Sequence, residues 1–421
     1  MIDKLRTQVL QRRKAVSTVS QPWSLAFVGL CVFTFAVVTF RLPVGELGIA
    51  LGIVGLLIHR EPVRIPAFLW FFLALVAWAY LASFFAPYAE QAGLEVLERL
   101  KLAIILLLAV NALRTPREIR FYLLFMVVCF LLFPARGALL NYFVVGYTRF
   151  GRAVWNYAYE NSNDLAAMAL LTLGASLAIA FSMEMKKYWR WFAAVSSAVF
   201  LLVLLLTQSR GGSLGLVAGF GPAAVLLVAR RSKGKVYLVL GVVLVLLVTP
   251  AAVWKRLSGI GELTSTANIS QADAEGSAAQ RWEIQQVGWD IFTDHPIFGV
   301  GLGGYKAANA VYASGLGARD THNTYLNVAA ELGLPGLALW IAMFVSVFRS
   351  GRRIAAVAAD QVWGGAVWVR RGLAGFLVAG VFGTYAYLSF PYLIAAVLWS
   401  ALAVRSSGSA SPKSSKTVLH S

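Results

Sequence analysis

Residues 372–404 read GLAGFLVAGVFGTYAYLSFPYLIAAVLWSALAV and contain no Asp, Glu, Lys or Arg. One α-helix of that length would measure about 50 Å, whereas the hydrocarbon core of a bilayer is about 30 Å thick. A proline disfavours helical backbone at the residue before it, so Phe390–Pro391 divides the run. We therefore predict two membrane-crossing helices joined by a tight turn.

The same apolar pattern recurs along the chain, in which 59 % of the 421 residues are hydrophobic and 13 % are charged. Because a soluble domain has about 25 % charged residues, this composition excludes a soluble enzyme, a disordered chain and a disulfide scaffold. Ten further apolar runs precede residue 372: Pro22–Phe40, Leu47–Ile58, Pro66–Ala89, Leu102–Leu113, Phe121–Ala135, Leu165–Met183, Trp191–Ser209, Gly211–Ala229, Val236–Trp254 and Leu332–Phe348. We expect an all-α polytopic membrane protein with about 12 transmembrane helices.

Basic residues predict the orientation of these helices. Five of them precede the first run, which indicates a cytoplasmic N-terminus, and 25 of the 37 Lys and Arg residues then lie on the cytoplasmic side. This distribution satisfies the positive-inside rule at every loop. The first run is long and lacks a small-residue cleavage site, so we expect no cleavable signal peptide.

The runs divide the chain into four parts. Residues 1–254 hold the N-terminus and nine helices, with an outer loop at about 136–163. Residues 255–322 form a large outer loop between helices 9 and 10, and residues 323–404 hold the last three helices. The Ser-rich, basic tail 405–421 is typical of a disordered segment. Chemistry on the outer face must therefore come from the two loops and the adjacent helix ends.

The large outer loop contains a predicted helix and a glycine-rich segment. Apolar and aromatic residues recur at near-helical spacing in Arg281–Phe292, which predicts an amphipathic helix, either on the membrane surface or packed on the protein. His295 precedes Pro296, as a turn residue does. No strand precedes Gly299–Gly304, so we exclude a dinucleotide fingerprint, but backbone amides that approach a phosphate remain an open alternative.

The segment 319–336, RDTHNTYLNVAAELGLPG, carries ionisable groups into a membrane helix. Such groups are costly in a membrane unless they face a wet cavity, which indicates a functional site. We expect Asp320 or Thr321 to cap the helix and His322 to share a face with Tyr325, which makes Tyr325 a further candidate for substrate binding. His322 is the candidate proton acceptor, and Asp320 or Glu331 could orient it or bind hydroxyl groups of a substrate.

Arginines on the outer side are the second indication of a functional site. Arg210 stands alone at the turn between two long apolar helices, where a guanidinium suits a planar anion such as phosphate. The other candidates for the same role are Arg136, Arg149, Arg152, Arg281 and Arg319. A position on the protein surface or a contact with lipid head groups is the alternative for each of these five arginines.

Together these motifs resemble the O-antigen ligase family, whose superfamily includes the Wzy-type polysaccharide polymerases. They are Ser-Arg-Gly-Gly at 209–212, Arg-Trp at 281–282, Asp-His-Pro-Ile-Phe-Gly-Val-Gly at 294–301, Thr-His-Asn-Thr-Tyr-Leu at 321–326 and Glu-Leu-Gly-Leu-Pro-Gly at 331–336. The resemblance implies a membrane glycosyltransferase C-type fold in the bacterial inner membrane. Matched by motif, the family histidine is His322, and the family arginines are Arg210 and Arg281.

The resemblance also implies an activity. Such enzymes move a glycan from undecaprenyl diphosphate to an acceptor hydroxyl on the periplasmic face, with inversion and without a metal or cofactor. The acceptor is lipid A-core in a ligase and another carrier-linked glycan in a polymerase, and both remain open. We expect membrane lipids, but no nucleic acid, among the partners.

Physical chemistry supports the same reaction. A diphosphate leaving group needs its growing negative charge stabilised, and preorganised arginines can do this. A transporter is a remote alternative, since it would favour repeated halves and polar groups at the membrane midplane. A non-catalytic scaffold for polysaccharide assembly is a further alternative.

Overall fold

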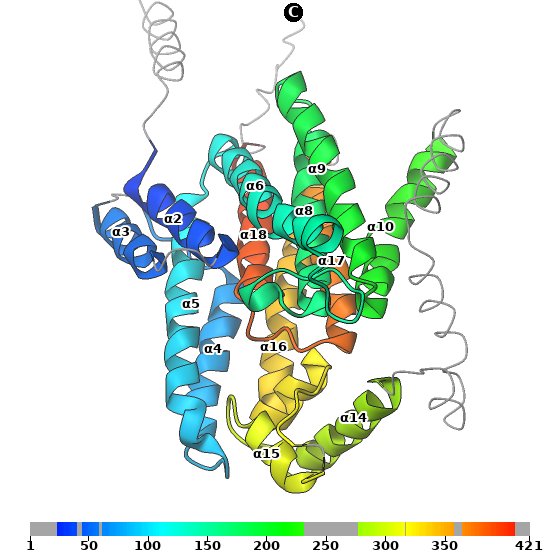
Figure 1. Ribbon diagram of the computed structural model, residues 1–421. Coiled ribbons are helices and arrows are strands. Elements are labelled where there is room, and N and C mark those ends of the chain that lie inside the picture. Colours follow the sequence, from blue (N-terminus) through cyan, green and yellow to red (C-terminus); the bar gives the residue numbers. More distant parts are fainter. Residues whose placement is uncertain are drawn as a thin grey trace, which may run out of the picture.

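The computed structural model describes residues 23–39, 44–58, 61–230, 277–315, 317–357 and 364–408. The elements in these ranges are helices (Figure 1). The α-helices are α2 (Leu25–Thr39), α3 (Gly45–Ile58), α4 (Ala67–Ala82), α5 (Ala92–Ala112), α6 (Pro116–Phe130), α7 (Arg136–Leu140), α8 (Ser162–Ala180), α9 (Lys187–Leu206), α10 (Arg210–Arg230), α14 (Ser277–Asp294), α15 (Tyr305–Tyr312), α16 (Thr324–Val357), α17 (Gly364–Ala379) and α18 (Phe390–Gly408). Short 3-10 helices are η1 (Ala89–Gln91), η4 (Tyr157–Tyr159) and η8 (Gly380–Phe382), and π-helices are η2 (Leu131–Ala135) and η3 (Asn141–Val145).

Apolar runs within the described residues fold into helices, as predicted. Five helical segments are long and apolar enough to cross a membrane: Pro116–Val145, Ser162–Ala180, Lys187–Leu206, Thr324–Ser350 and Gly365–Phe382. Four shorter apolar helices accompany them among the described residues. The chain is a polytopic helical membrane protein, and the total of about 12 spans remains a prediction. The predicted span Val236–Trp254, the first part of the large loop and the end of the tail lie outside the described residues.

The long uncharged run divides differently from the prediction. α17 ends at Ala379, and α18 begins at Phe390, so the connection is a ten-residue segment instead of a tight turn. Pro391 lies in the first turn of α18, where a missing N–H costs nothing. The connection brings polar backbone and tyrosine side chains between two apolar helices, a feature that hydropathy alone does not detect.

The first predicted outer loop also begins later than expected. From Pro116 the helix continues through η2, α7 and η3 to Val145, so Arg136 lies on a helix and not in a loop. Pro134 lies in the first π-helical segment, where the wider turn accommodates it. Gly146, with φ of 75°, ends the helix in the left-handed conformation.

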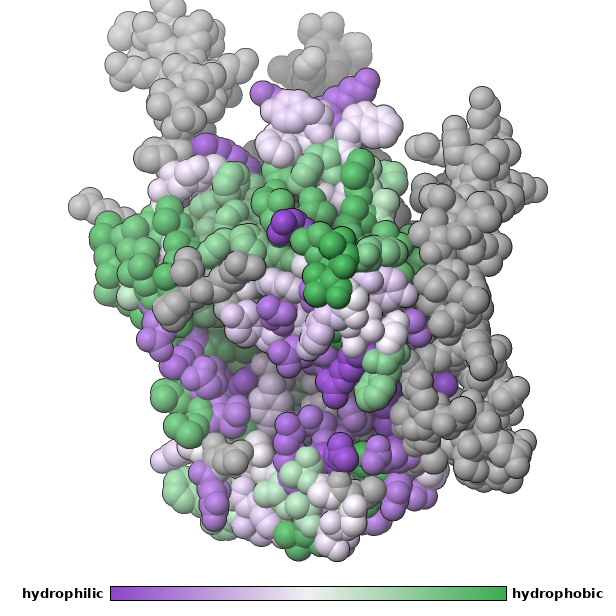
Figure 2. All heavy atoms as spheres, viewed as in Figure 1, coloured by the Kyte–Doolittle hydropathy of each residue, from purple (hydrophilic) through white to green (hydrophobic). Residues whose placement is uncertain are grey.

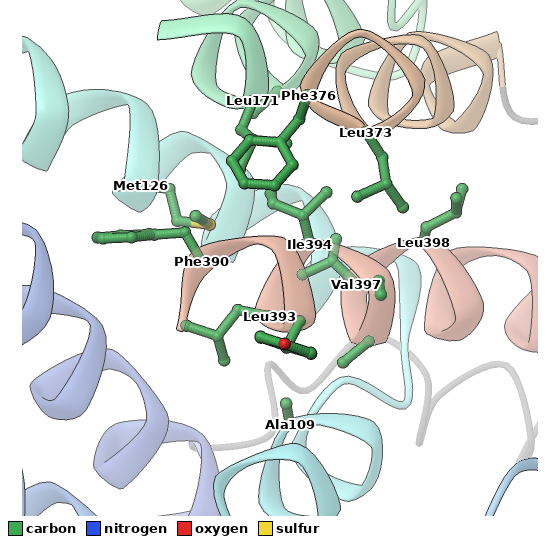
Figure 3. Close-up of a cluster of buried hydrophobic side chains, with 14 of the residues drawn as sticks. Ala109, Met126, Leu171, Leu373, Phe376, Phe390, Leu393, Ile394, Val397 and Leu398 are labelled. Carbon is green, nitrogen blue, oxygen red and sulfur yellow. The ribbon is translucent and has the colours of Figure 1, made fainter. Parts of the chain in front are cut away.

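The core surrounds α18. The side chains of Leu393, Ile394 and Val397 are fully buried. Figure 3 shows this cluster among side chains from four other helices, namely Ala109 of α5, Met126 of α6, Leu171 of α8, and Leu373 and Phe376 of α17. α18 therefore serves as the central element against which the other helices pack.

Hydrophobic and hydrophilic surfaces separate along the molecule. Figure 2 shows a hydrophobic band over the upper half, where Figure 1 places α2, α3, α6 and α9. Hydrophilic residues predominate below this band, toward the end that α14 and α15 form. α14, which carries Arg281, and the segment between α15 and α16, which carries Arg319 and His322, belong to that hydrophilic end.

Candidate functional site

His322 lies immediately outside the first turn of α16. The Oδ1 atom of Asn323 accepts the backbone N–H of Tyr325 at 3.0 Å and of Leu326 at 3.1 Å, so Asn323 caps the helix. The prediction of Asp320 or Thr321 as the cap was wrong. His322 has a φ of 51°, in the left-handed region, and it therefore does not share a helix face with Tyr325 as predicted.

The charges of three arginines, each from a different segment, act on the pKa of His322. Burial lowers the pKa of His322 to about 4, and the charges of Arg281, Arg319 and Arg149 act in the same direction. The charge of Asp320 opposes them, and this carboxylate also pairs with Lys306 at 3.3 Å. The imidazole is therefore neutral near pH 7 and can accept a proton.

Arg149 and Arg152 form a tight turn on the other loop. Their backbones exchange two hydrogen bonds of 3.1 Å, and Phe150 and Gly151 between them have φ values of 54° and 70°. Arg152 donates from Nε to the Thr207 carbonyl at 2.7 Å and from Nη2 to Oδ1 of Asn163 at 2.8 Å. Arg152 thus fixes the turn that carries Arg149 against the end of α9.

Asn163 connects this turn to the entrance of α16. Its Oδ1 also accepts the hydroxyl of Ser209 at 2.9 Å, and its carbonyl accepts the hydroxyl of Tyr385 at 3.2 Å. The backbone N–H of Tyr385 donates to the Thr324 hydroxyl at 2.9 Å, two residues after His322. Four separate segments therefore meet in one buried hydrogen-bond network.

Arg210 begins α10 beside this network. The hydroxyl of Ser209 accepts the N–H of Gly212 at 3.2 Å and so caps the helix, which places the guanidinium of Arg210 at a positive helix end. A Cβ on Gly211 or Gly212 would lie 2.8 Å from Phe382 or Ala166, respectively. The two glycines after Arg210 therefore allow α10 to pack closely on its neighbours.

Two predicted site residues lie apart from the group around His322. The hydroxyl of Tyr325 donates to the Leu377 carbonyl at 2.8 Å, and its ring packs edge-on against Trp340, so Tyr325 joins α16 to α17. Arg136 is exposed on α7. Electrostatic interaction relates His322 to Arg149, Arg281 and Arg319. Hydrogen bonds through Asn163 and Tyr385 connect Arg152 and Ser209, the residue before Arg210, to Thr324 at the start of α16.

The glycine-rich segment is a packing element. Val300 donates to the Ala330 carbonyl at 2.9 Å, and Gly301 donates to the Glu331 carbonyl at 3.0 Å. A Cβ on Gly299 would lie 2.4 Å from that second carbonyl oxygen. The amides of Gly299, Gly303 and Gly304 also donate within the protein, to the His295 carbonyl, the Tyr387 hydroxyl and the Gly301 carbonyl. These five amides are therefore not available to a phosphate, which argues against the phosphate-binding alternative.

Glu331 is buried behind this segment. Its carboxylate accepts the Tyr387 hydroxyl, Nδ2 of Asn327 at 3.2 Å and the N–H of Tyr305 at 3.4 Å. These partners indicate that Glu331 holds the loop on α16. Sequence reasoning missed Tyr385 and Tyr387 because both lie inside the predicted span, although the polar Gly-Thr-Tyr-Ala-Tyr stretch at 383–387 could have indicated a break.

The predicted helix in the large loop is confirmed as α14. Ile284 and Ile291 are buried, whereas Trp282 and Trp289 are about half exposed. α14 therefore packs on the protein through one face and leaves tryptophans on the other. Within the described ranges no group of three His, Cys, Asp or Glu side chains could hold a metal ion. Metal independence remains a prediction.

Comparison with known families adds the last finding. Residues 195–341 match the family model described as O-antigen ligase, and this segment includes Arg210, Arg281, the glycine-rich segment and His322. No curated protein matches the chain. The match supports the resemblance that the sequence motifs indicated: over residues 195–341 the chain is similar to the O-antigen ligase family.

Proposed function

We propose that the protein transfers a glycan from undecaprenyl diphosphate to an acceptor hydroxyl on the periplasmic face of the bacterial inner membrane, as an O-antigen ligase. The observation that carries the proposal is a half-buried His322 just before α16, whose pKa is lowered by burial and by the charges of Arg281, Arg319 and Arg149. A neutral base and clustered guanidinium groups are what an alcohol nucleophile and a diphosphate leaving group require.

The reaction is a single displacement at the anomeric carbon. The acceptor oxygen forms a bond to that carbon while its proton passes to a ring nitrogen of His322. The bond from the carbon to the phosphate oxygen breaks, and undecaprenyl diphosphate leaves with the electron pair, which inverts the configuration. His322 then releases its proton to water.

The arginines have two effects in this reaction. Their positive charge stabilises the diphosphate as its negative charge grows. The same charge lowers the pKa of His322, so the ring is neutral near pH 7 and can accept the acceptor proton. Because the bound diphosphate partly offsets the arginines, donor binding strengthens the base that activates the acceptor.

Polymerase activity of the Wzy type is the second candidate, because the superfamily of the matched family includes polymerases as well as ligases. The same residues would act, and the acceptor would be another carrier-linked glycan instead of lipid A-core. The two candidates differ in the product, and an assay with both acceptors separates them.

The test is glycan transfer by the purified full-length protein. Undecaprenyl-diphosphate-linked glycan is incubated with lipid A-core or with additional donor, and the lengthened product identifies ligase or polymerase. His322→Ala should reduce the rate at least about 100-fold. The matched control is His295→Ala, because the His295 ring lies 3.4 Å from the Tyr312 hydroxyl and outside the arginine group. Product from neither acceptor, or full activity in His322→Ala, would contradict the proposal.

A further inference from the structure

A groove between the end of α8 and the start of α9 is lined by two basic side chains. It has a volume of about 940 Å³, and Lys187 and Arg190 in the first turn of α9 supply its charge. The rest of its lining is apolar except for Ser197, and no acidic side chain of the described residues lines it. We call this space the α9 groove.

The positive charge of the α9 groove is not neutralised by an acidic residue in the described part of the chain. The Nε atom of Arg190 donates to the Ala180 carbonyl at 3.1 Å, which fixes the guanidinium and leaves its two Nη groups for another acceptor. Glu184, the acidic residue of the connection between α8 and α9, forms an ion pair with Arg120 on α6. The ion pairs between described residues include neither Lys187 nor Arg190.

Helix stability does not explain the position of these two charges. The amino end of an α-helix carries a partial positive charge, so basic side chains in the first turn are unfavourable there. α9 has no acidic residue in its first turn, and its cap residue Lys186 makes no side-chain hydrogen bond to the helix. The positive-inside rule accounts for basic residues on this side of the membrane but not for two that line one groove. An anion between Lys187 and Arg190 would offset the charge of both side chains and of the helix end.

The rest of the α9 groove suits a hydrocarbon chain. The ring of Phe181 stacks on the ring of Trp368 of α17 with centroids 4.9 Å apart, so one wall of the groove is fixed. The side chain of Trp191 is 64 % exposed, as an aromatic residue at a membrane interface is. The hydroxyl of Ser197 is hydrogen-bonded to that of Ser176 at 2.7 Å, so the far end of the groove needs no polar ligand.

The length of the α9 groove matches one leaflet of a bilayer. Lys187 and Ser197 are ten positions apart on α9, which corresponds to about 15 Å. This length is half of the hydrocarbon core, which is about 30 Å thick. The opposite end of α9 lies toward the proposed site, because the Thr207 carbonyl just after the helix accepts Nε of Arg152. In the predicted orientation the charged end of the groove therefore faces the cytoplasmic leaflet, away from the proposed glycan transfer.

We propose that the α9 groove binds one anionic phospholipid. The phosphate lies at Lys187 and Arg190, and an acyl chain follows the groove past Ala194 to Ser197. Charge complementarity favours an anionic head group, and an apolar lining as long as one leaflet favours a lipid over a soluble phosphate. Basic pockets between transmembrane helices on the cytoplasmic side bind anionic lipid head groups in this way. This lipid site does not depend on the proposed glycan transfer.

The test compares phosphatidylglycerol with phosphatidylcholine bound to the purified full-length protein, measured by native mass spectrometry. Arg190→Gln should weaken phosphatidylglycerol binding about fivefold, and the double variant with Lys187→Gln about 25-fold, with little change for phosphatidylcholine. The matched control is Arg349→Gln, because Arg349 is exposed on α16 on the same predicted side of the membrane but does not line the groove. An equal loss in this control would indicate diffuse attraction between charges and would overturn the proposal.

A second variant tests the apolar part of the groove without changing a charge. Ala194 is exposed and lines the groove, so Ala194→Trp should fill it and weaken phosphatidylglycerol binding at least about fivefold, with an unchanged melting temperature of the lipid-free protein. Val195→Trp is the matched control, because Val195 is exposed on the same turn of α9 but outside the groove. Equal affinity for the two lipids, or wild-type affinity in Arg190→Gln or Ala194→Trp, would overturn the proposal. So would full displacement of the lipid by soluble glycerol phosphate, which would assign a soluble ligand instead.

Discussion

Replacing Arg281 by Gln should move the acidic limit of glycan transfer to higher pH. Burial and nearby arginines lower the pKa of His322 to about 4, and Arg281 has the largest effect among the charges. Removal of this positive charge makes protonation of the ring easier, so the pKa must rise. Since only the neutral ring accepts a proton, activity is then lost at a higher pH as the solution is acidified.

The size of the change follows from Coulomb's law. Two unit charges roughly 10 Å apart at an effective dielectric constant of about 20 interact by about 1.7 kcal/mol. This interaction energy corresponds to a pKa difference of about one unit, so the pKa of His322 should rise to about 5 in the variant. At pH 4.5, the activity relative to pH 7 should be about threefold lower than in the wild type.

The assay is kcat/KM as a function of pH, because this quantity reports ionisations of the free protein. Each profile is normalised to its own value at pH 7, so a general loss of rate in Arg281→Gln does not affect the comparison. The control is Arg136→Gln, whose guanidinium is exposed on α7 and outside the group around His322. An unchanged midpoint in Arg281→Gln, or a shift of the same size in the control, would refute the electrostatic role.

Four further predictions concern the diphosphate, the hydrogen-bond network and the loop on α16. Arg210→Lys should lose at least about 90 % of the transfer rate at saturating donor, because an ammonium keeps the charge without the two-point geometry of guanidinium; near-normal turnover would remove Arg210 from the diphosphate site. EDTA should leave the rate unchanged, and a loss that magnesium restores would contradict stabilisation by arginine alone. Asn163→Ala should lower the free energy of unfolding by about 2 kcal/mol, because Arg152 and Ser209 lose a buried acceptor; an unchanged thermal unfolding curve would argue against the network. Gly333→Ala should cost at least about 2 kcal/mol, since φ is 67° and the new Cβ would lie 2.0 Å from the Ile297 carbonyl; Gly93→Ala, with nothing within 4 Å, is the neutral control in the same unfolding measurement.

The helices were predictable because the absence of charge over about 20 residues restricts a chain to few structures in a membrane. Their ends were less predictable. Arg136 was predicted to end a span, but arginine is a good helix former and the helix continues past it to Val145. In the connection at 383–387 the polar groups bond within the protein, for example Tyr385 with Asn163, so hydropathy alone does not detect the break.

The cap of α16 illustrates a limit of local reasoning. Asp320, Thr321, Asn323 and Thr324 are all residues that cap helices, so the sequence alone does not choose among them. Tertiary contacts make the choice. The hydroxyl of Thr321 lies 3.1 Å from that of Thr384, and the hydroxyl of Thr324 donates to the Gly383 carbonyl at 2.6 Å. With both threonines engaged across the interface, Asn323 caps the helix.

The position of His322 follows from the same contacts. The residue before the cap must turn the chain sharply, and His322 does so with a φ of 51°, a conformation that costs about 1 kcal/mol or more for a non-glycine residue. The interface that fixes Thr321 and Thr324 on either side supplies the stabilisation. Residue type identified His322 as a candidate base, but its electrostatic interaction with three arginines depends on this turn. Replacement of Thr324 should therefore alter the backbone conformation of His322, although the imidazole ring itself is unchanged.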